Sequence, residues 1–314
     1  MNESPPLITI GITCFNAESS IRRAVESALA QSWAHKEIIV VDDCSTDSSL
    51  ETLKDLKGIK VIHHEQNIGP GGARQTLLNE AQGEFIAFFD DDDESLPHRL
   101  SAQYDVIRKA EITHGHSKIA CYCSGMKLYP NGYKVPIDAI GRKPIAPYGE
   151  GMADRILSFA SENEGWCYGG TPTCSLMVST KEIKSVGGFD PTFRRVEDLD
   201  FAVRFALAGG VFTGTMQRLF KQYATLGNDK THRKNLMSEI QLIEKHKDYL
   251  QSKNRYYHAR YWPELRCAHF ERKYAKFISV LCGLIIHHPV LTFSQLLKNG
   301  PKRIIHEYKM GKKR

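Results

Sequence analysis

Residues 90–93 are four consecutive aspartates, and they are the group in this sequence best suited to hold a metal ion. They follow 84–89, which has the composition of a buried strand, and a second acidic pair, Asp42 and Asp43, follows the similar segment 37–41. Adjacent like charges are unfavourable unless a cation neutralises them. Carboxylates without His or Cys beside them suit a hard ion such as Mg²⁺ or Mn²⁺, which is commonly shared with substrate phosphates. The alternative is a solvated acidic turn.

Glu197 and Asp198 form a second candidate site. They stand at the start of a helix that the apolar spacing of Leu199, Ala202 and Val203 predicts. The free N–H groups in the first turn of a helix favour a carboxylate and keep it ionised, so a carboxylate there is suited to act as a base. The alternative is an acidic capping pair without chemistry.

The first part of the chain alternates between predicted strands and helices. Strands are predicted at 7–14, 37–41, 59–63 and 84–89, and helices at 21–29, 47–57 and 71–81. This alternation predicts a right-handed, parallel, doubly wound α/β sheet, Rossmann-like with flanking helices. Ligands bind beyond the carboxyl ends of the strands in such sheets, so both acidic clusters are expected at the binding edge.

The remainder is less regular. We predict a helix at 98–113, a strand at 119–128, a Pro/Gly-rich excursion at 130–150, a strand at 176–179, a helix from Leu199 to Gly209, a polar loop at 225–235 and mostly helices beyond. The turn after the first strand, 13–16, lacks a G-x-G-x-x-G motif, which counts against a nicotinamide or flavin enzyme. The glycines of 69–74 can admit a nucleotide close to the backbone, and a plain turn is an equal alternative.

Composition excludes several classes of protein. With 314 residues, 41% hydrophobic and 25% charged, the chain is an ordinary globular one rather than disordered or repetitive. Its eight cysteines match neither a zinc site nor a disulfide scaffold, so we expect reduced, mostly buried thiols. Neither a secretory signal nor a membrane-spanning segment is predicted, which favours a cytoplasmic location.

The net charge of +6 averages two different segments. Residues 253–314 hold 14 Lys and Arg against three acidic residues, so the rest of the chain is mildly acidic. Aromatic side chains are interspersed among these cations, a composition typical of helices that bind anionic membrane surfaces. The alternative is that the aromatics pack this segment onto the rest of the protein. No nucleic acid is expected, because no recognisable module accompanies the basic residues.

Taken together, the motifs resemble the family 2 inverting glycosyltransferases of the GT-A fold. The matching segments are ITCFN (12–16), VVDDCSTD (40–47), NIGPGGAR (67–74), FFDDDDESLPHRL (88–100), GGFD (187–190) and VEDLDFAVR (196–204). Their order and spacing agree over about 200 residues. The resemblance implies a GT-A domain at 1–225, with a nucleotide-sugar-binding half (1–105) and an acceptor-side half (106–225). The last 80 or so residues lie outside the resemblance, and from their own composition and pattern we predict a basic, mostly helical region at 226–314.

The resemblance also implies roles for individual residues. Thr13 and Phe15 would line the base pocket, Asp43 would accept a hydrogen bond from the base, and Arg74 would lie beside it. The family's D-x-D corresponds to 90–92: Asp90 would lie near the ribose, Asp91 would belong to the nucleotide-sugar site, and Asp92 would be the principal ligand of Mn²⁺ or Mg²⁺. Asp198 would be the catalytic base.

Two departures from the family pattern are visible. Cys44 stands where a small Gly is usual, and the Q-x-x-R-W motif of processive synthases is missing after Arg204. The second departure favours addition of a single sugar. His232, in the predicted 225–235 loop, can close over a diphosphate or add a metal ligand, although such a histidine is more often simply solvated.

The expected function is therefore metal-dependent transfer of one sugar, a hexose or N-acetylhexosamine, from a nucleotide-sugar donor to a hydroxyl group. A UDP-sugar is favoured as the donor and a glycan or lipid-linked molecule as the acceptor, in cell-surface polysaccharide or lipopolysaccharide synthesis at the cytoplasmic face of the membrane. One alternative is a nucleotidyltransferase, although such enzymes usually carry a basic Gly-rich loop after the first strand. Another is a catalytically silent nucleotide-sugar-binding subunit.

Overall fold

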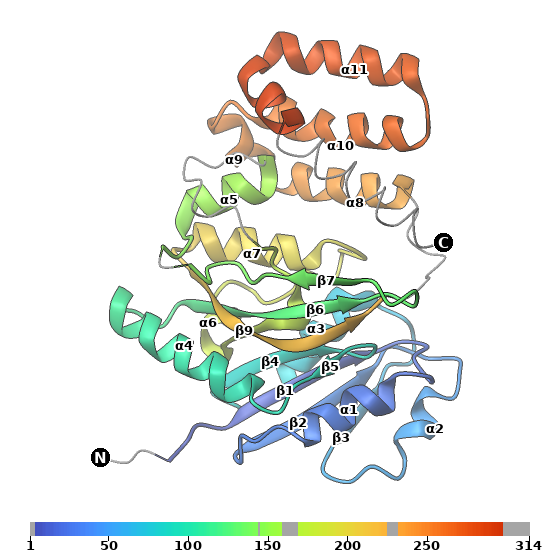
Figure 1. Cartoon of the computed structure of the whole chain (residues 1–314), viewed down its shortest axis with the longest axis vertical. Helices are drawn as coiled ribbons and strands as arrows, with labels where there is room; N and C mark the ends of the chain where they lie inside the picture. Colours follow the sequence, from blue (N-terminus) through green and yellow to red (C-terminus); the bar gives the residue numbers. More distant parts are fainter. Residues whose placement is uncertain (1–3, 144, 159–168, 225–231, 298–314) are drawn as a thin grey trace.

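The computed structural model describes residues 4–143, 145–158, 169–224 and 232–297 (Figure 1). The strands are β1 (Ile8–Cys14), β2 (Lys36–Asp42), β3 (Lys60–His63), β4 (Phe85–Asp90), β5 (Glu94–Ser95), β6 (Ile119–Leu128), β7 (Lys134–Ile137), β8 (Leu176–Ser179) and β9 (Val211–Tyr223). The helices are α1 (Ile21–Leu29), α2 (Ser49–Leu53), α3 (Gly69–Glu80), α4 (Arg99–His114), α5 (Gly149–Ser158), α6 (Thr180–Ser185), α7 (Glu197–Leu207), α8 (His232–Lys245), α9 (Lys247–Ser252), α10 (Tyr256–Phe270) and α11 (Tyr274–His287). All strands belong to one curled sheet.

The amino-terminal strands pair in parallel, as the alternating pattern predicts. The sheet order is β3-β2-β1-β4-β8-β6-β9-β5, with β7 paired to β6. In the register of β1 with β4, Thr13 lies opposite Asp90, and Cys14 lies opposite Asp42 of β2. The carboxyl ends of β1, β2 and β4 therefore meet at one edge, and the two acidic clusters that follow β2 and β4 meet there with them.

The sheet is not parallel throughout. Strand β8 lies between β4 and β6 and is antiparallel to both, while the long ladder between β6 and β9 is parallel. The sequence segment LMVS of β8 is apolar and only four residues long. A short apolar run of this kind carries no information about strand direction, which is why the antiparallel insertion was not predicted.

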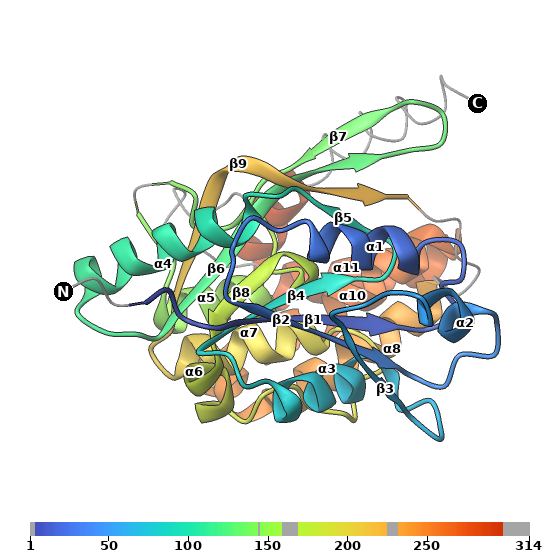
Figure 2. The ribbon, with the colours of Figure 1, turned by 90° about the horizontal axis from the view of Figure 1, so that it is seen from below.

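Helices cover both faces of the sheet (Figure 2). On one face, α1 and α4 pack on the side chains of Ile8, Ile10 and Ile12. On the other face, Leu77 of α3 and the phenylalanines of α7 form the largest core cluster with β4 and β9. Burial of β1 on both faces explains its continuous apolar sequence, because neither face of the strand meets water.

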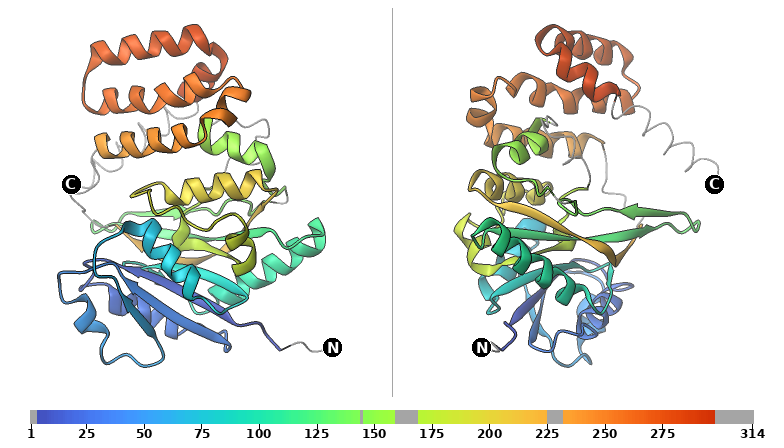
Figure 3. Two further views of the ribbon diagram at one scale, coloured as in Figure 1. Left: turned by 180° about the vertical axis from the view of Figure 1, so that it is seen from behind. Right: turned by 60° about the vertical axis from the view of Figure 1, so that its left-hand side comes forward.

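The carboxyl-terminal helices α8 to α11 stack beyond α7, on the side away from the first sheet strands (Figure 3). Leu242, Leu250 and Ala259 belong to the same core cluster as α7. In addition, Lys253 pairs with Glu150 at 2.6 Å and Arg255 pairs with Asp154 at 2.7 Å. Part of the basic charge of 253–314 thus neutralises acids of the preceding chain. The division at 225/226 stays a prediction.

Two predicted irregular segments contain regular structure. Within 130–150, β7 forms a hairpin with β6 around Asn131 and Gly132, and Gly132 has a φ of +76°. Asn-Gly is a strong hairpin signal, so the sequence did contain this information. The predicted loop 225–235 is wrong from His232 onward, because α8 begins there; 225–231 lie outside the described residues. Arg233 and Lys234 are exposed residues in the first turn of α8. Consecutive polar residues are also typical of loops, which is why a loop was predicted here.

Among the described residues no helix is long and apolar enough to cross a membrane. The seven described cysteines are free, and five of them are buried, as expected for reduced thiols in a core. Cys44 has a φ of +64°, a left-handed backbone conformation that a residue with a Cβ adopts at a cost of about 1–2 kcal/mol. That conformation is the physical reason for a glycine at this position in the family pattern.

Candidate active site

The ends of β1 and β4 are joined by a carboxylate. Asp91 accepts a hydrogen bond from the backbone N–H of Phe15 at 3.0 Å. Burial, and then repulsion from Asp90 and Asp92, raise the pKa of Asp91 to about 7. The ring of Phe15 is 49% exposed beside this contact, and Thr13 is half-buried. An exposed aromatic ring at the carboxyl edge of a parallel sheet offers a surface on which a base can stack.

The second acidic pair holds the loop that precedes α3. Asp43 is buried and accepts hydrogen bonds from the backbone N–H groups of Ile68 (2.9 Å) and Gly69 (2.7 Å). A ring nitrogen of His64 lies 2.9 Å from the same carboxylate. These contacts fix the start of α3 against the end of β2. The role of Asp43 toward a base stays a prediction.

The glycines of 69–74 serve a close approach within the protein. A Cβ atom built on Gly71 would lie 2.7 Å from the backbone oxygen of Asp190, which is closer than real side chains come. Gly69 has a φ of +84° and lies against Arg194. The segment therefore lets α3 pack against the loop before α7, which explains its glycines without a nucleotide.

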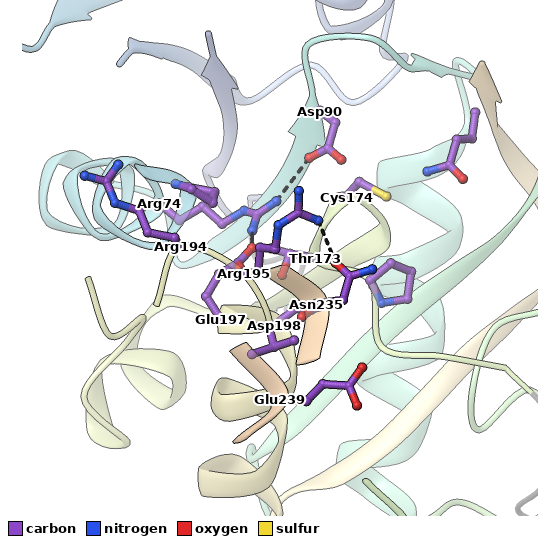
Figure 4. Close-up of a pocket in the computed structure, with 14 residues that line it drawn as sticks. Arg74, Asp90, Thr173, Cys174, Arg194, Arg195, Glu197, Asp198, Asn235 and Glu239 are labelled. Carbon is purple, nitrogen blue, oxygen red and sulfur yellow. Dashed lines mark hydrogen bonds and ion pairs between the residues drawn. The ribbon is translucent and has the colours of Figure 1, made fainter. Parts of the chain in front are cut away.

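Arg74 joins the two acidic groups of the site (Figure 4). Its buried guanidinium pairs with Glu197 of α7 and, at 3.3 Å, with Asp90 of β4. Burial alone would lower the pKa of Arg74, but Glu197, Asp90 and Asp198 raise it, so the side chain stays charged. Through this one cation, the end of β4 is connected to the start of a helix more than a hundred residues later.

Asp198 stands in the first turn of α7, next to Glu197. Its carboxylate accepts the N–H of Leu199 at 2.8 Å. Burial, and then the charge of Glu197, raise its pKa to about 6, while Arg74 opposes the rise. Val196, the residue just before α7, has a φ of +59°, an unfavourable conformation for a β-branched side chain. Strained backbone of this kind is concentrated at functional sites.

These residues line a pocket of about 380 Å³. Its walls come from β4, α3, the short turn at Thr173–Ser175, α7 and α8; the lining residues are Pro70, Arg74, Asp90, Pro172, Thr173, Cys174, Arg194, Arg195, Val196, Glu197, Asp198, Gln222, Asn235 and Glu239. Asn235 of α8 accepts a hydrogen bond from Arg195 at 3.0 Å. The carboxyl-terminal region therefore completes one wall of the pocket.

A possible cation site lies at the same edge. Ligand atoms of Asp90, Asp93 and Cys174 lie within 4.8 Å of one another. Asp93 is buried, both of its carboxylate oxygens lack a hydrogen-bond partner, and burial followed by Asp90 and Asp92 raise its pKa to about 8. A buried carboxylate in this state is unfavourable without a cation, so Asp90 and Asp93 fit a divalent ion. Asp92 is outside this group; its backbone oxygen accepts a hydrogen bond from Arg23 at 2.7 Å.

The structure thus brings Arg74, Asp90 and Asp198 into one pocket, with Thr13, Phe15 and Asp91 at the adjoining strand ends. His232 is the first residue of α8, and its side chain lies outside the described residues. Sequence reasoning missed Asp93, Cys174 and the α8 residues Asn235 and Glu239. The four-aspartate run contained a signal for Asp93, whereas a lone cysteine and two polar helix residues contain none.

Residues 9–134 match the model of the family described as glycosyl transferase family 2. An uncharacterised glycosyltransferase of Haemophilus influenzae is 35% identical over 128 residues, which are 39% of this chain and 51% of that protein. The Escherichia coli UDP-Glc:alpha-D-GlcNAc-diphosphoundecaprenol beta-1,3-glucosyltransferase WfaP is 34% identical over 113 residues, 35% of this chain and 45% of that protein. The chain thus spans about half the length of these curated relatives.

Among solved structures, S. aureus TarS 1-349 in complex with UDP-GlcNAc aligns with a TM-score of 0.60 at 20% identity, covering 88% of this chain and 80% of that one. A curled, mostly parallel sheet with helices on both faces and an acidic carboxyl edge defines the GT-A class of fold, which this similarity confirms. The chain carries a family 2 glycosyltransferase domain over residues 9–134.

Proposed function

We propose that this protein is an inverting glycosyltransferase that moves one sugar from a nucleoside-diphosphate sugar to a hydroxyl group of a glycan or lipid-linked acceptor. The observation that carries the proposal is the double pairing of Arg74 with Asp90 and Glu197, which brings Asp90 and the Glu-Asp pair to one pocket. Similarity to TarS, solved with UDP-GlcNAc, and to WfaP, a glucosyltransferase using UDP-Glc, supports a UDP-sugar as the donor and a hexose or N-acetylhexosamine as the sugar.

The donor would bind across the carboxyl edge. The exposed ring of Phe15 is suited to stack on the base, with Thr13 and Asp43 behind it, and Asp90 and Asp91 would contact the remainder of the nucleotide. The diphosphate would lie toward the aspartate run. Arg194 and Arg195 line the pocket and are suited to bind the negatively charged diphosphate. One guanidinium group can donate two parallel hydrogen bonds to two phosphate oxygens.

A divalent ion, Mn²⁺ or Mg²⁺, would be held by Asp92, the ligand that the family resemblance implies, with the buried Asp93 and Asp90 beside it. Such an ion neutralises charge on a departing diphosphate. His232 remains a further candidate ligand from the start of α8. The protein's own part is to orient the diphosphate on one side of the anomeric carbon and the acceptor on the other.

The acceptor hydroxyl would lose its proton to Asp198. Attack from the face opposite the diphosphate is a single in-line displacement and inverts the anomeric centre, so no covalent enzyme nucleophile is needed. Asn235 and Glu239 of α8 line the same pocket and would contact the acceptor. WfaP, by its name, acts on a diphosphoundecaprenol-linked sugar, which supports a lipid-linked acceptor and work at the cytoplasmic face of a membrane in cell-surface glycan synthesis.

We expect the glycosyltransferase activity to decrease at acidic pH. Because the pKa of Asp198 is raised to about 6, the carboxylate takes up its proton as the pH falls through that value and can no longer act as a base. At saturating Mn²⁺, kcat/KM should fall about tenfold per pH unit below pH ~6. A thermal melt at each pH excludes unfolding as the cause. A flat profile between pH ~5 and ~7 would argue against Asp198 as the base.

A thermal-shift panel tests donor and metal together. UDP and several nucleotide sugars are each added with and without Mn²⁺, and we expect Tm to rise by a few degrees, most where both are present, since ligands that bind only the folded state stabilise it by mass action. Asp92→Asn and Asp93→Asn should each reduce the part of the Tm rise that depends on Mn²⁺. Asp55→Asn changes an exposed aspartate that does not line the pocket and should leave the rise unchanged. No shift with any nucleotide in either condition would contradict the proposed function.

A further inference from the structure

Helix α11 is the outermost helix of the structure (Figures 1 and 3), and several of its apolar side chains are exposed. Tyr274, Ile278 and Ile286 are exposed by 62%, 58% and 78%, whereas Leu284 on the inner face is fully buried. The exposed positions are separated by four and eight residues, so they lie along one side of the helix. A helix that only packed on α10 would present polar residues to water on this side.

The helical stretch 289–297, which follows α11 in the chain, also has exposed apolar residues. Val290, Phe293 and Leu297 are exposed by 83%, 50% and 75% and are spaced by three and four residues. We call the outward residues of the two helices the apolar stripe: Tyr274, Ile278, Ile286, Val290, Phe293 and Leu297. Isolated exposed apolar residues are common, but three at helical spacing on each of two consecutive helices mark an interaction surface.

Charge distinguishes this segment from the rest of the basic region. Between 272 and 306 the sequence has no Asp or Glu and six Lys or Arg. Cations that precede residue 272 form ion pairs with acidic residues of the protein. Lys253 and Arg255 pair with Glu150 and Asp154, as described above, and Arg266 of α10 pairs with Glu239. Lys273 and Lys276 pair with Glu271 and Glu264, but their side chains remain 62% and 52% exposed.

We propose that the apolar stripe inserts into the surface of an anionic lipid bilayer, with Arg272, Lys273 and Lys276 on the lipid headgroups. Apolar side chains along one face, flanked by exposed Lys and Arg, are the features of helices that lie in the membrane interface. The proposal limits the predicted membrane-binding surface from 253–314 to α11 and the helical stretch 289–297, because Arg260 and Arg266 of α10 form ion pairs within the protein. It deepens the lipid-linked acceptor proposed above, which would reside in the same surface.

Charge also separates a bilayer from a second copy of the chain as the occupant. Two copies joined through the apolar stripe would bring two carboxylate-free, cationic segments together, and like charges at an interface cost free energy. An anionic lipid surface supplies the opposite charge and accepts apolar side chains. The stripe therefore fits lipid headgroups and acyl chains better than it fits itself.

The test is co-sedimentation of the full chain with vesicles of phosphatidylcholine containing about one third phosphatidylglycerol, and with vesicles of phosphatidylcholine alone. We expect binding to the anionic vesicles, weakened by salt. The double variant Ile278→Glu/Ile286→Glu should bind at least tenfold more weakly. Because both side chains are exposed, its thermal melt should match that of the wild type. The matched control is Ile112→Glu, an isoleucine of α4 that is 83% exposed and lies outside the stripe.

Three results would overturn the proposal: no binding to either vesicle, equal binding by the double variant, or a wild-type dimer in light scattering that the double variant breaks. The last result would assign the stripe to a second copy. Vesicle binding is measured without donor or turnover, so its failure is distinguishable from failure of the glycosyltransferase function. Conversely, absent turnover with intact vesicle binding would leave the membrane surface standing.

Discussion

Replacing Asp198 by Asn is expected to lower kcat by about 10²–10⁴-fold, the range that loss of a general base produces. Asn has the same shape and can still accept the N–H of Leu199. It cannot take a proton from the acceptor hydroxyl. The Kd of the nucleotide sugar, measured by calorimetry, should stay close to the wild-type value, because Asp198 is proposed to contact the acceptor rather than the donor.

Two controls separate catalysis from folding. Removal of a half-buried charge that lies beside Glu197 should leave the Tm of Asp198→Asn at or above that of the wild type. Asp55→Asn makes the same chemical change at an exposed site and should retain full activity. A variant at position 198 with near-normal kcat would remove Asp198 from the mechanism, whatever its effect on binding.

Replacing Arg74 by Met is expected to lower the free energy of unfolding by about 3–5 kcal/mol, measured by urea titration. The substitution leaves Glu197 buried and Asp90 partly buried, without the cation that pairs them. Arg22→Met is the matched control: it removes an exposed pair with Asp55 and should cost less than about 1 kcal/mol.

A second substitution identifies the cause of that loss. If the unpaired carboxylate is responsible, Glu197→Gln in the Arg74→Met background should restore part of the stability, since it removes one uncompensated charge. A loss no larger than that of Arg22→Met, or no recovery in the double variant, would mean that Arg74 does not hold the two acidic groups together.

The sequence contained enough to predict where the acidic clusters lie. Continuous apolar strands alternating with helices fix a parallel sheet, and chain direction then puts the residues after β2 and β4 at one edge. The helix start at Glu197 followed from apolar spacing. These features are local, so a single sequence reveals them.

What could not be predicted depends on contacts between distant segments. Arg74 meets Glu197 only because the Gly71 region packs closely on the loop before α7, and neither partner signals the other in the sequence. All four residues of 90–93 are aspartates, so the sequence does not indicate which of them is buried. The burial of Asp93 follows from the turn after β4. Asn235 lines the pocket because α8 packs beside it. The sequence did not predict α8 from its first residue, because the first turn of this helix is polar.

The most direct test of the proposed mechanism is release of nucleoside diphosphate from nucleotide sugars with Mn²⁺ present, water serving as a slow acceptor where none is supplied. We expect the wild-type protein to release UDP from at least one UDP-sugar. The Asp198→Asn variant should bind the same UDP-sugar but release no UDP from it. Equal release by the variant would contradict the assignment of the base. Release of pyrophosphate from a nucleoside triphosphate, with none from any nucleotide sugar, would contradict the proposed function itself.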